Sequence, residues 1–272
     1  MRRGMSTYVY AKRERLHPGL LDRMVAGGAE VIEIFGSRGH FNYSDRQHVR
    51  EIGNWFRTSG VSFHAMHSPM RLNEELGRTD VPTLNIAAVE KRERIVAMDE
   101  IKRSIEVAEQ APFQFLVQHI GVNNDTADER RIEAAITSLE HLRAFAKPLG
   151  VQVVVENVPN EISTPAVLME ILHLGRFTDI GVCLDVGHAH CREGIPQAFE
   201  TMKDRIRTTH VHDNHGESDE HLWPGSGTID WKETLELLRT APQVPAMVME
   251  VAGIEGENVP EKMAQAYKEI GV

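Results

Sequence analysis

The stretch Val151-Gln-Val-Val-Val-Glu156 decides the fold of this chain, because it is a short apolar run that ends on a carboxylate. The same design occurs in Ile180-Gly-Val-Cys-Leu-Asp185 and in Ala246-Met-Val-Met-Glu250. Each run has the length and composition of a buried strand in a parallel sheet. A carboxylate in such a place must be paired, bound to a metal or exposed, since burying it alone is costly. Three such strand ends predict a metal site at one end of a sheet.

Strand-like and helix-like stretches alternate through the whole chain. The expected strands are Thr7–Tyr10, Glu30–Phe35, Val61–His67, Phe113–His119, Val151–Glu156, Ile180–Asp185, Ile206–His212 and Ala246–Val251. The expected helices are Pro18–Ala26, Asp45–Ser59, Ala88–Glu109, Ala127–Lys147, Thr164–His173, Ile195–Lys203, Trp231–Arg239 and Val259–Ile270. Eight β-α units without an obvious linker predict one closed (β/α)8 barrel domain over residues 1–272, with its active site at the carboxyl ends of the strands. A doubly wound open sheet is the alternative, which the lack of a glycine-rich nucleotide loop after the first strand disfavours.

Composition limits the class of protein. Hydrophobic residues make up 41% and charged residues 26%, as in ordinary globular proteins, and no apolar run is long enough to span a membrane. The two cysteines form no disulfide framework, and we expect a reducing cytoplasm. The net charge of -10 disfavours binding to nucleic acid, but bound cations would reverse the sign locally, so a nucleic-acid substrate stays open. Association into a homo-oligomer is also open.

Side chains that ligate metals follow most of the predicted strands. They are His67, His119, Glu156, Asp185, His188, His210, Asp219, His221 and Glu250. Imidazole and carboxylate ligands without thiolate suit Zn, Mn, Fe or Co, with Mg as a further candidate, and suit Ca poorly. One metal takes about four to six ligands, so this set allows one to three ions.

The segment His210-Val-His-Asp-Asn214 concentrates such residues. His210 and His212 share one face of a strand by the period-two rule, so both can point towards the barrel axis. Asp213 is placed to orient one of these imidazoles as a hydrogen-bond acceptor. A solvated loop rich in His and Asp is the alternative interpretation.

Four motifs together resemble the xylose isomerase-like TIM barrel superfamily, over essentially the full chain. They are Glu156-Asn-Val-Pro, Leu184-Asp-Val-Gly-His188, His210-Val-His-Asp-Asn and Asp219-Glu-His-Leu-Trp-Pro-Gly-Ser-Gly-Thr-Ile-Asp-Trp231. This superfamily includes sugar and sugar-phosphate isomerases and epimerases, and also endonuclease IV.

The resemblance to the epimerase branch implies a divalent-metal-dependent isomerase or epimerase of a sugar or sugar phosphate. One core metal would be held by Glu156, Asp185, His210 and Glu250. Glu156 and Glu250 would be the catalytic bases that transfer a proton through a metal-stabilised enediolate. The expected substrate-binding residues are His188, His212 and His67. The chain departs from this branch because no Arg follows His212-Asp-Asn.

The resemblance to endonuclease IV implies three metals and all nine ligands, and gives the alternative function, a multi-metal phosphodiesterase acting on abasic DNA. Asp219 and His221 are the informative pair, since a one-metal isomerase does not require them. DNA binding would need basic, stacking loops. The loop after His67 instead carries Glu74 and Glu75, which repel phosphates. We therefore expect the isomerase first and the nuclease second.

Overall fold

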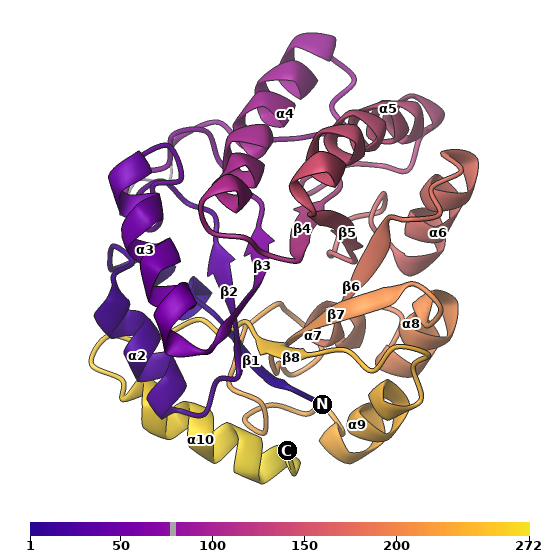
Figure 1. Cartoon of the computed structure of the whole chain (residues 1–272). Coiled ribbons are helices and arrows are strands. Elements are labelled where there is room, and N and C mark those ends of the chain that lie inside the picture. The colour runs from indigo at the N-terminus through magenta and orange to yellow at the C-terminus, as the bar shows by residue number, and fades with distance from the viewer. Residues whose placement is uncertain (77–79) are drawn as a thin grey trace.

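Eight parallel strands close into a barrel at the centre of the molecule (Figure 1). The computed structural model describes residues 1–76 and 80–272. The strands are β1 (Arg3–Ser6), β2 (Val31–Phe35), β3 (Ser62–His67), β4 (Phe115–His119), β5 (Gln152–Glu156), β6 (Gly181–Asp185), β7 (Ile206–Val211) and β8 (Met247–Met249). Each strand pairs with its neighbour in the chain, and β1 pairs with β8 to close the ring. The predicted (β/α)8 barrel is confirmed.

Helices surround the barrel as an outer ring (Figure 1). They are α1 (Tyr8–Ala11), α2 (Pro18–Ala26), α3 (Arg46–Ser59), α4 (Lys91–Ile105), α5 (Glu129–Ala146), α6 (Pro165–Leu174), α7 (Val186–His190), α8 (Ile195–Met202), α9 (Trp231–Arg239) and α10 (Val259–Ile270), with 3-10 turns at Glu106–Glu109 and Lys147–Leu149. Across the described ranges, no helix has the length and apolar character that a membrane crossing requires. The short helix α7 was not expected from the sequence.

The first strand was predicted wrongly at Thr7–Tyr10. Its β-branched and aromatic residues favour a strand, but the chain turns into α1 there, and the Thr7 hydroxyl accepts a hydrogen bond from the Phe35 amide at 2.9 Å. β1 lies earlier, in a segment without strand-like side chains. Gly4 permits it, because a Cβ there would come within 2.9 Å of the Val31 side chain. Close packing between neighbouring strands overrides local propensity.

A small apolar cluster fills the barrel interior beneath the strand ends. It consists of Ala65, Phe115, Val117, Val154 and Cys183, all buried. Because side chains alternate along a strand, these residues share the inward face with the ligand-type residues that end the same strands. The polar side chains at the strand ends therefore lie directly above a layer of buried apolar side chains.

Two buried tyrosines allow a test of how much the hydrogen bond between α10 and β1 stabilises the barrel. The Tyr267 hydroxyl of α10 donates a hydrogen bond to the Gly4 carbonyl oxygen at 2.6 Å, whereas the buried Tyr10 hydroxyl has no hydrogen-bond partner among the described residues. We expect Tyr267→Phe to lower the free energy of unfolding by about 1 kcal/mol. Tyr10→Phe is the matched control and should change it little. Urea unfolding measures both, and equal effects would contradict the assignment.

Candidate metal centre

A pocket of about 510 Å³ opens at the carboxyl ends of the strands. All nine predicted ligand residues lie at this end of the barrel. His67 ends β3, His119 ends β4, Glu156 ends β5, Asp185 ends β6, His188 lies in α7, His210 lies in β7, Asp219 and His221 lie in the β7–α9 loop, and Glu250 directly follows β8. The structure thus brings together residues from six strands and the segments that follow them.

Four of these residues form a core cluster deep in the pocket. The core cluster consists of Glu156, Asp185, His210 and Glu250, whose candidate ligand atoms all lie within 4.8 Å of one another. His210 Nδ1 is 3.1 Å from Glu156 Oε1 and 3.5 Å from Glu250 Oε2. All four side chains are buried. Three carboxylates and one imidazole around one point form a donor set suited to a divalent cation.

The second carboxylate oxygen of Glu156 faces a different pair of side chains. Glu156 Oε2 is 3.1 Å from His119 Nε2 and 3.7 Å from His67 Nε2. The two imidazole nitrogens are themselves 3.2 Å apart. These three residues form the histidine-pair cluster. One carboxylate therefore contributes an oxygen to each of two adjacent clusters, which is the placement of a bridging ligand.

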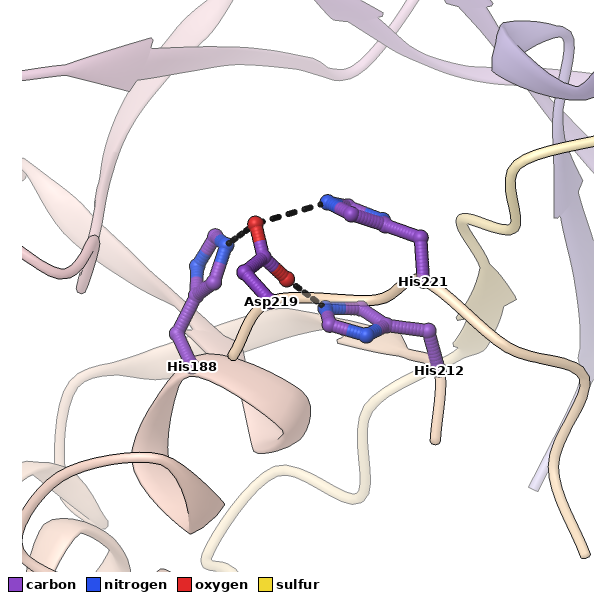
Figure 2. A group of neighbouring side chains, drawn as sticks. All are labelled: His188, His212, Asp219 and His221. Atoms are coloured by element: carbon purple, nitrogen blue, oxygen red, sulfur yellow. Dashed lines mark hydrogen bonds and ion pairs between the residues drawn. The ribbon is translucent and has the colours of Figure 1, made fainter. Parts of the chain in front are cut away.

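The outer cluster consists of His188, His212, Asp219 and His221 (Figure 2). Asp219 Oδ2 lies 3.2 Å from His188 Nε2 and 3.1 Å from His221 Nε2, while Asp219 Oδ1 lies 3.6 Å from His212 Nε2. Figure 2 shows the three imidazoles turned towards the single carboxylate from different segments. This is a third donor set at the same mouth of the barrel.

Backbone carbonyls orient three of the imidazoles. In each of these rings, which belong to His67, His188 and His221, Nδ1 lies against a backbone carbonyl oxygen. Nδ1 therefore carries the N–H that donates to the carbonyl, and the lone pair of Nε2 faces a cluster. The acceptors are the carbonyl oxygens of Ser68, Asn157 and Glu250, at 2.9, 2.9 and 2.7 Å. This is how proteins commonly fix the ring of a metal-binding histidine.

Glu33 orients the His210 ring through Nε2, whereas the three histidines above are held through Nδ1. Its Oε2 is 2.9 Å from His210 Nε2, and both side chains are fully buried. Burial raises the pKa of Glu33, but His210 outweighs this and holds it below its ordinary value. His210 Nδ1, not Nε2, therefore faces the core cluster.

The carboxylates of the core cluster have different electrostatic surroundings. Burial favours the neutral form of Glu156, but the nearby His210 and His119 lower its pKa well below the ordinary value. For Glu250, burial is the largest effect and raises the pKa, although His210 and His67 act in the opposite direction. Glu250 is thus the carboxylate of this pair that accepts a proton more readily.

Two imidazoles of the outer cluster, those of His188 and His221, are held in the charged form when no cation is present. Burial lowers the pKa of His188, yet Asp185 and Asp219 raise it to about 10. Burial likewise opposes charging of His221, but its hydrogen bond with Asp219 raises the pKa to about 9. A metal must displace these protons, so its affinity will fall as the pH is lowered.

Several atoms of the core cluster fit a divalent cation because they are buried and make no hydrogen bond among the described residues. Glu156 Oε1, Asp185 Oδ2, His210 Nδ1 and Glu250 Oε1 are buried and make no hydrogen bond within residues 1–76 and 80–272. Buried polar atoms are rarely left in this state. Nitrogen and oxygen donors without thiolate favour Zn, Mn, Fe or Co. The residues present therefore fit the predicted metal.

The predicted role of Asp213 as an acceptor for an imidazole is wrong. Asp213 instead accepts hydrogen bonds from the Gly225 amide at 2.9 Å and the Trp231 indole at 2.8 Å. These hydrogen bonds fix the position of the β7–α9 loop that carries Asp219 and His221. Asp213 supports the outer cluster through the backbone, a role that spacing along a strand does not reveal.

The three predicted substrate-binding histidines are placed differently. His67 and His188 line the pocket. His212 is fully buried and lies 3.1 Å from Asp185, which favours a ligand or positioning role. α7 can approach His212 because residue 187 is glycine: a Cβ on Gly187 would come within 2.1 Å of the imidazole ring.

Two further pocket residues were not singled out from the sequence. Tyr8 lines the pocket from α1, and Gln118 lines it from β4. Tyr8 was hidden by the wrong assignment of the first strand. Gln118 was hidden because it directly precedes His119, and adjacent strand residues are expected on opposite faces.

The sequence of this chain matches a known family over most of its length. Residues 21–269 match the profile described as xylose isomerase-like TIM barrel. The chain belongs to this family. The predicted resemblance is confirmed.

Two curated relatives share part of this family sequence. The uncharacterized protein MJ1614 of Methanocaldococcus jannaschii is 30% identical over 152 residues, which cover 56% of this chain and 60% of the relative. The uncharacterized protein y4fM of Sinorhizobium fredii is 26% identical over 189 residues, covering 64% of this chain and 61% of the relative. The matched part thus spans about three fifths of the length of these relatives.

Solved structures share the fold over nearly the whole chain. A D-tagatose 3-epimerase-like protein superposes with a TM-score of 0.79 and 24% identity, covering 99% of this chain and 97% of its own. D-psicose 3-epimerase, solved with D-fructose, gives a TM-score of 0.76 and 17% identity, with full coverage of both chains (100% each). The IOLI protein, solved with a bound zinc atom, gives 0.78 and 18%, covering 100% and 97%. Sugar epimerases are therefore among the proteins with this fold.

Glu33 provides a test of the core cluster that leaves the candidate ligands intact. We expect Glu33→Gln to weaken metal binding about 10–100-fold, because His210 loses its charged partner. Isothermal titration with Zn or Mn measures this. Glu30→Gln is the control, since Glu30 directly precedes β2 and accepts a hydrogen bond from the Arg3 amide. Unchanged metal affinity in Glu33→Gln would contradict the orienting role.

Proposed function

We propose that this protein is a divalent-metal-dependent hydrolase that cleaves a phosphate ester of a small molecule at a centre of two or three adjacent metal ions. The observation that carries the proposal is the placement of Glu156, whose two oxygens face the core cluster and the histidine-pair cluster. Carboxylate-rich centres with adjacent metals are typical of phosphatases and nucleases. Asp219 and His221 supply a further donor set beside them.

Bound cations would supply neutralisation of phosphoryl charge and a lower pKa for water. The chain's own contribution is a proton acceptor: Glu250 holds Oε2 in the core cluster, while Oε1 is buried and makes no hydrogen bond within the described ranges. The free Oε1 is placed to take a proton from the attacking water. The water oxygen bonds to phosphorus, the ester P–O bond breaks, and the leaving alkoxide takes up the proton that Glu250 received from the water.

The size and charge of the mouth favour a small substrate over duplex DNA. A volume of about 510 Å³ is in the range of small-molecule pockets. Glu74 and Glu75 lie on the β3–α4 loop, which lines the pocket through Met70 and Thr83, in a chain with a net charge of -10. Phosphates of a long polyanion would meet repulsion there.

A second candidate function is the metal-dependent sugar or sugar-phosphate isomerase or epimerase expected from the sequence. The core cluster favours it, since Glu250 is again placed as a base, and sugar epimerases share the fold. This reaction needs a proton to leave one carbon and return to the substrate. Glu156, the other expected base, has Oε2 beside His119 and His67, which supports its role as a ligand over that of a free base.

Metal stoichiometry tests the multi-metal proposal. Protein dialysed against excess Zn or Mn and then freed of unbound metal should retain more than one ion per chain, counted by plasma mass spectrometry. Asp219→Ala should remove one ion and leave the core cluster loaded. The exposed Glu217→Ala, two residues away on the same loop, is the control. A single ion in both wild type and Asp219→Ala would contradict the proposal and favour the one-metal isomerase.

Two assays on the metal-loaded protein separate the candidate reactions. Release of phosphate or alcohol from a panel of small phosphate esters should occur in wild type and fall at least about 100-fold in Glu250→Gln. Incorporation of solvent deuterium at a carbon of a ketose or ketose phosphate, without ester cleavage, would instead establish the isomerase. Cleavage of an abasic-site duplex in preference to small esters would show that the substrate is DNA.

A further inference from the structure

The short helix α1 holds Tyr8 in a fixed position in the wall of the pocket. At the start of this helix, the Thr7 hydroxyl accepts a hydrogen bond from the Phe35 amide at 2.9 Å, which ties α1 to the end of β2. On another side, a Cβ on Gly253 would come within 2.3 Å of the Val9 carbonyl oxygen, so glycine there lets the segment after β8 pack directly on α1. The helix is therefore held from two directions.

The Tyr8 ring packs against two other residues of the pocket wall. Its centroid lies 5.0 Å from that of Phe35 and 5.2 Å from that of His221. Burial raises the pKa of the Tyr8 hydroxyl, and the charges of Glu250 and Asp219 act in the same direction. The hydroxyl is therefore within electrostatic reach of a carboxylate of the core cluster and a carboxylate of the outer cluster.

Lys12 interacts with Tyr8 from the residue that follows α1. Its Nζ lies 5.2 Å from the centroid of the Tyr8 ring. Its hydrogen bond to the Tyr8 hydroxyl and its positive charge work against the burial that raises the pKa of this group. An ammonium group can only donate, so it uses a lone pair of the phenolic oxygen and leaves the O–H free. A hydrogen bond received by the oxygen also makes the hydroxyl a stronger donor.

The histidines of the clusters use their ring N–H groups within the protein. In His67, His188 and His221, Nδ1 donates to a backbone carbonyl oxygen, and the lone pair of Nε2 faces a cluster. Phosphoryl transfer, however, leaves negative charge on the oxygens that stay on phosphorus, and donors already fixed in place stabilise that charge. A phenol in the wall of the same pocket is a donor of this kind.

We infer that Tyr8 is a further catalytic residue, whose hydroxyl donates a hydrogen bond to a phosphoryl oxygen that stays on phosphorus, with Lys12 as its positioning residue. This inference rests on the proposed hydrolase function and adds a transition-state contact to it. Tyr8 keeps its proton, so the bonds that form and break are those of ester hydrolysis as stated above. The hydrogen bond strengthens as charge builds on the oxygen, so it acts on the rate more than on substrate binding.

Kinetics of Tyr8→Phe test this role, because the substitution keeps the ring and its packing. The assay uses Zn-loaded protein and the small phosphate ester that wild type hydrolyses best. We expect kcat to fall on the order of 100-fold, as for the loss of one fixed donor to a developing oxyanion, while KM changes less than about twofold. Tyr10→Phe removes a hydroxyl from the same helix and is the control, which should behave as wild type.

Vanadate and methylphosphonate test the same contact without turnover. Vanadate adopts the five-coordinate geometry of a phosphoryl group in transfer, whereas methylphosphonate resembles the bound ester. Calorimetric titration should show vanadate binding at least about tenfold more weakly to Tyr8→Phe than to wild type, with unchanged affinity for methylphosphonate. Lys12→Met should weaken vanadate binding by a smaller factor. It should have no further effect in the Tyr8→Phe background, because it acts through the hydroxyl.

The outcomes separate this inference from the proposed function. A wild type that hydrolyses phosphate esters, beside a Tyr8→Phe variant with the same kcat and the same vanadate affinity, overturns the role of Tyr8 and leaves the hydrolase standing. Equal losses of vanadate and methylphosphonate affinity would make Tyr8 a ground-state contact and overturn the stated role. A lower metal count in Tyr8→Phe would assign the loss to the clusters and overturn it too. A wild type that neither hydrolyses esters nor binds vanadate contradicts both proposals.

Discussion

The carboxylate of Glu156 is the constraint on which the site depends. Its Oε1 lies 3.1 Å from His210 and its Oε2 lies 3.1 Å from His119, so it belongs to two clusters at once. Placing a charged group at 0% exposure is costly unless the surroundings compensate. The closed barrel provides that compensation, because β7 and β4 bring the imidazoles of His210 and His119 to its two oxygens. The apolar floor beneath excludes water and strengthens each of these interactions.

Much of this arrangement follows from local sequence pattern. Apolar runs that end on a carboxylate or imidazole located the carboxyl ends of most strands. In a closed barrel these ends lie on one rim, so their side chains come together. The first strand could not be found in this way, since Arg3–Ser6 lacks strand-like side chains and depends on Gly4 for close packing. The role of Asp213 was also hidden, because its partners in the β7–α9 loop meet it only after the loop folds.

The choice between reactions turns on a detail that sequence does not contain. The order of motifs places Glu156 in a core ligand set for both an isomerase and a multi-metal hydrolase. Only the structure tells which oxygen faces which neighbours, and whether Asp219 meets His188 and His221. Those contacts support the hydrolase, which the sequence alone had placed second. Glu250 is the proton acceptor in either reaction, so its loss does not discriminate between them.

With two ions bound, Glu156 would be a ligand of both, one through each oxygen, and magnetic coupling tests this directly. Protein loaded to saturation with Mn(II) is measured by electron paramagnetic resonance, beside Glu156→Gln prepared in the same way. We expect the spectrum of a spin-coupled manganese pair in wild type and its loss in the variant. A saturated wild-type protein that shows only isolated, uncoupled Mn(II) would contradict the bridging role and the hydrolase proposal built on it.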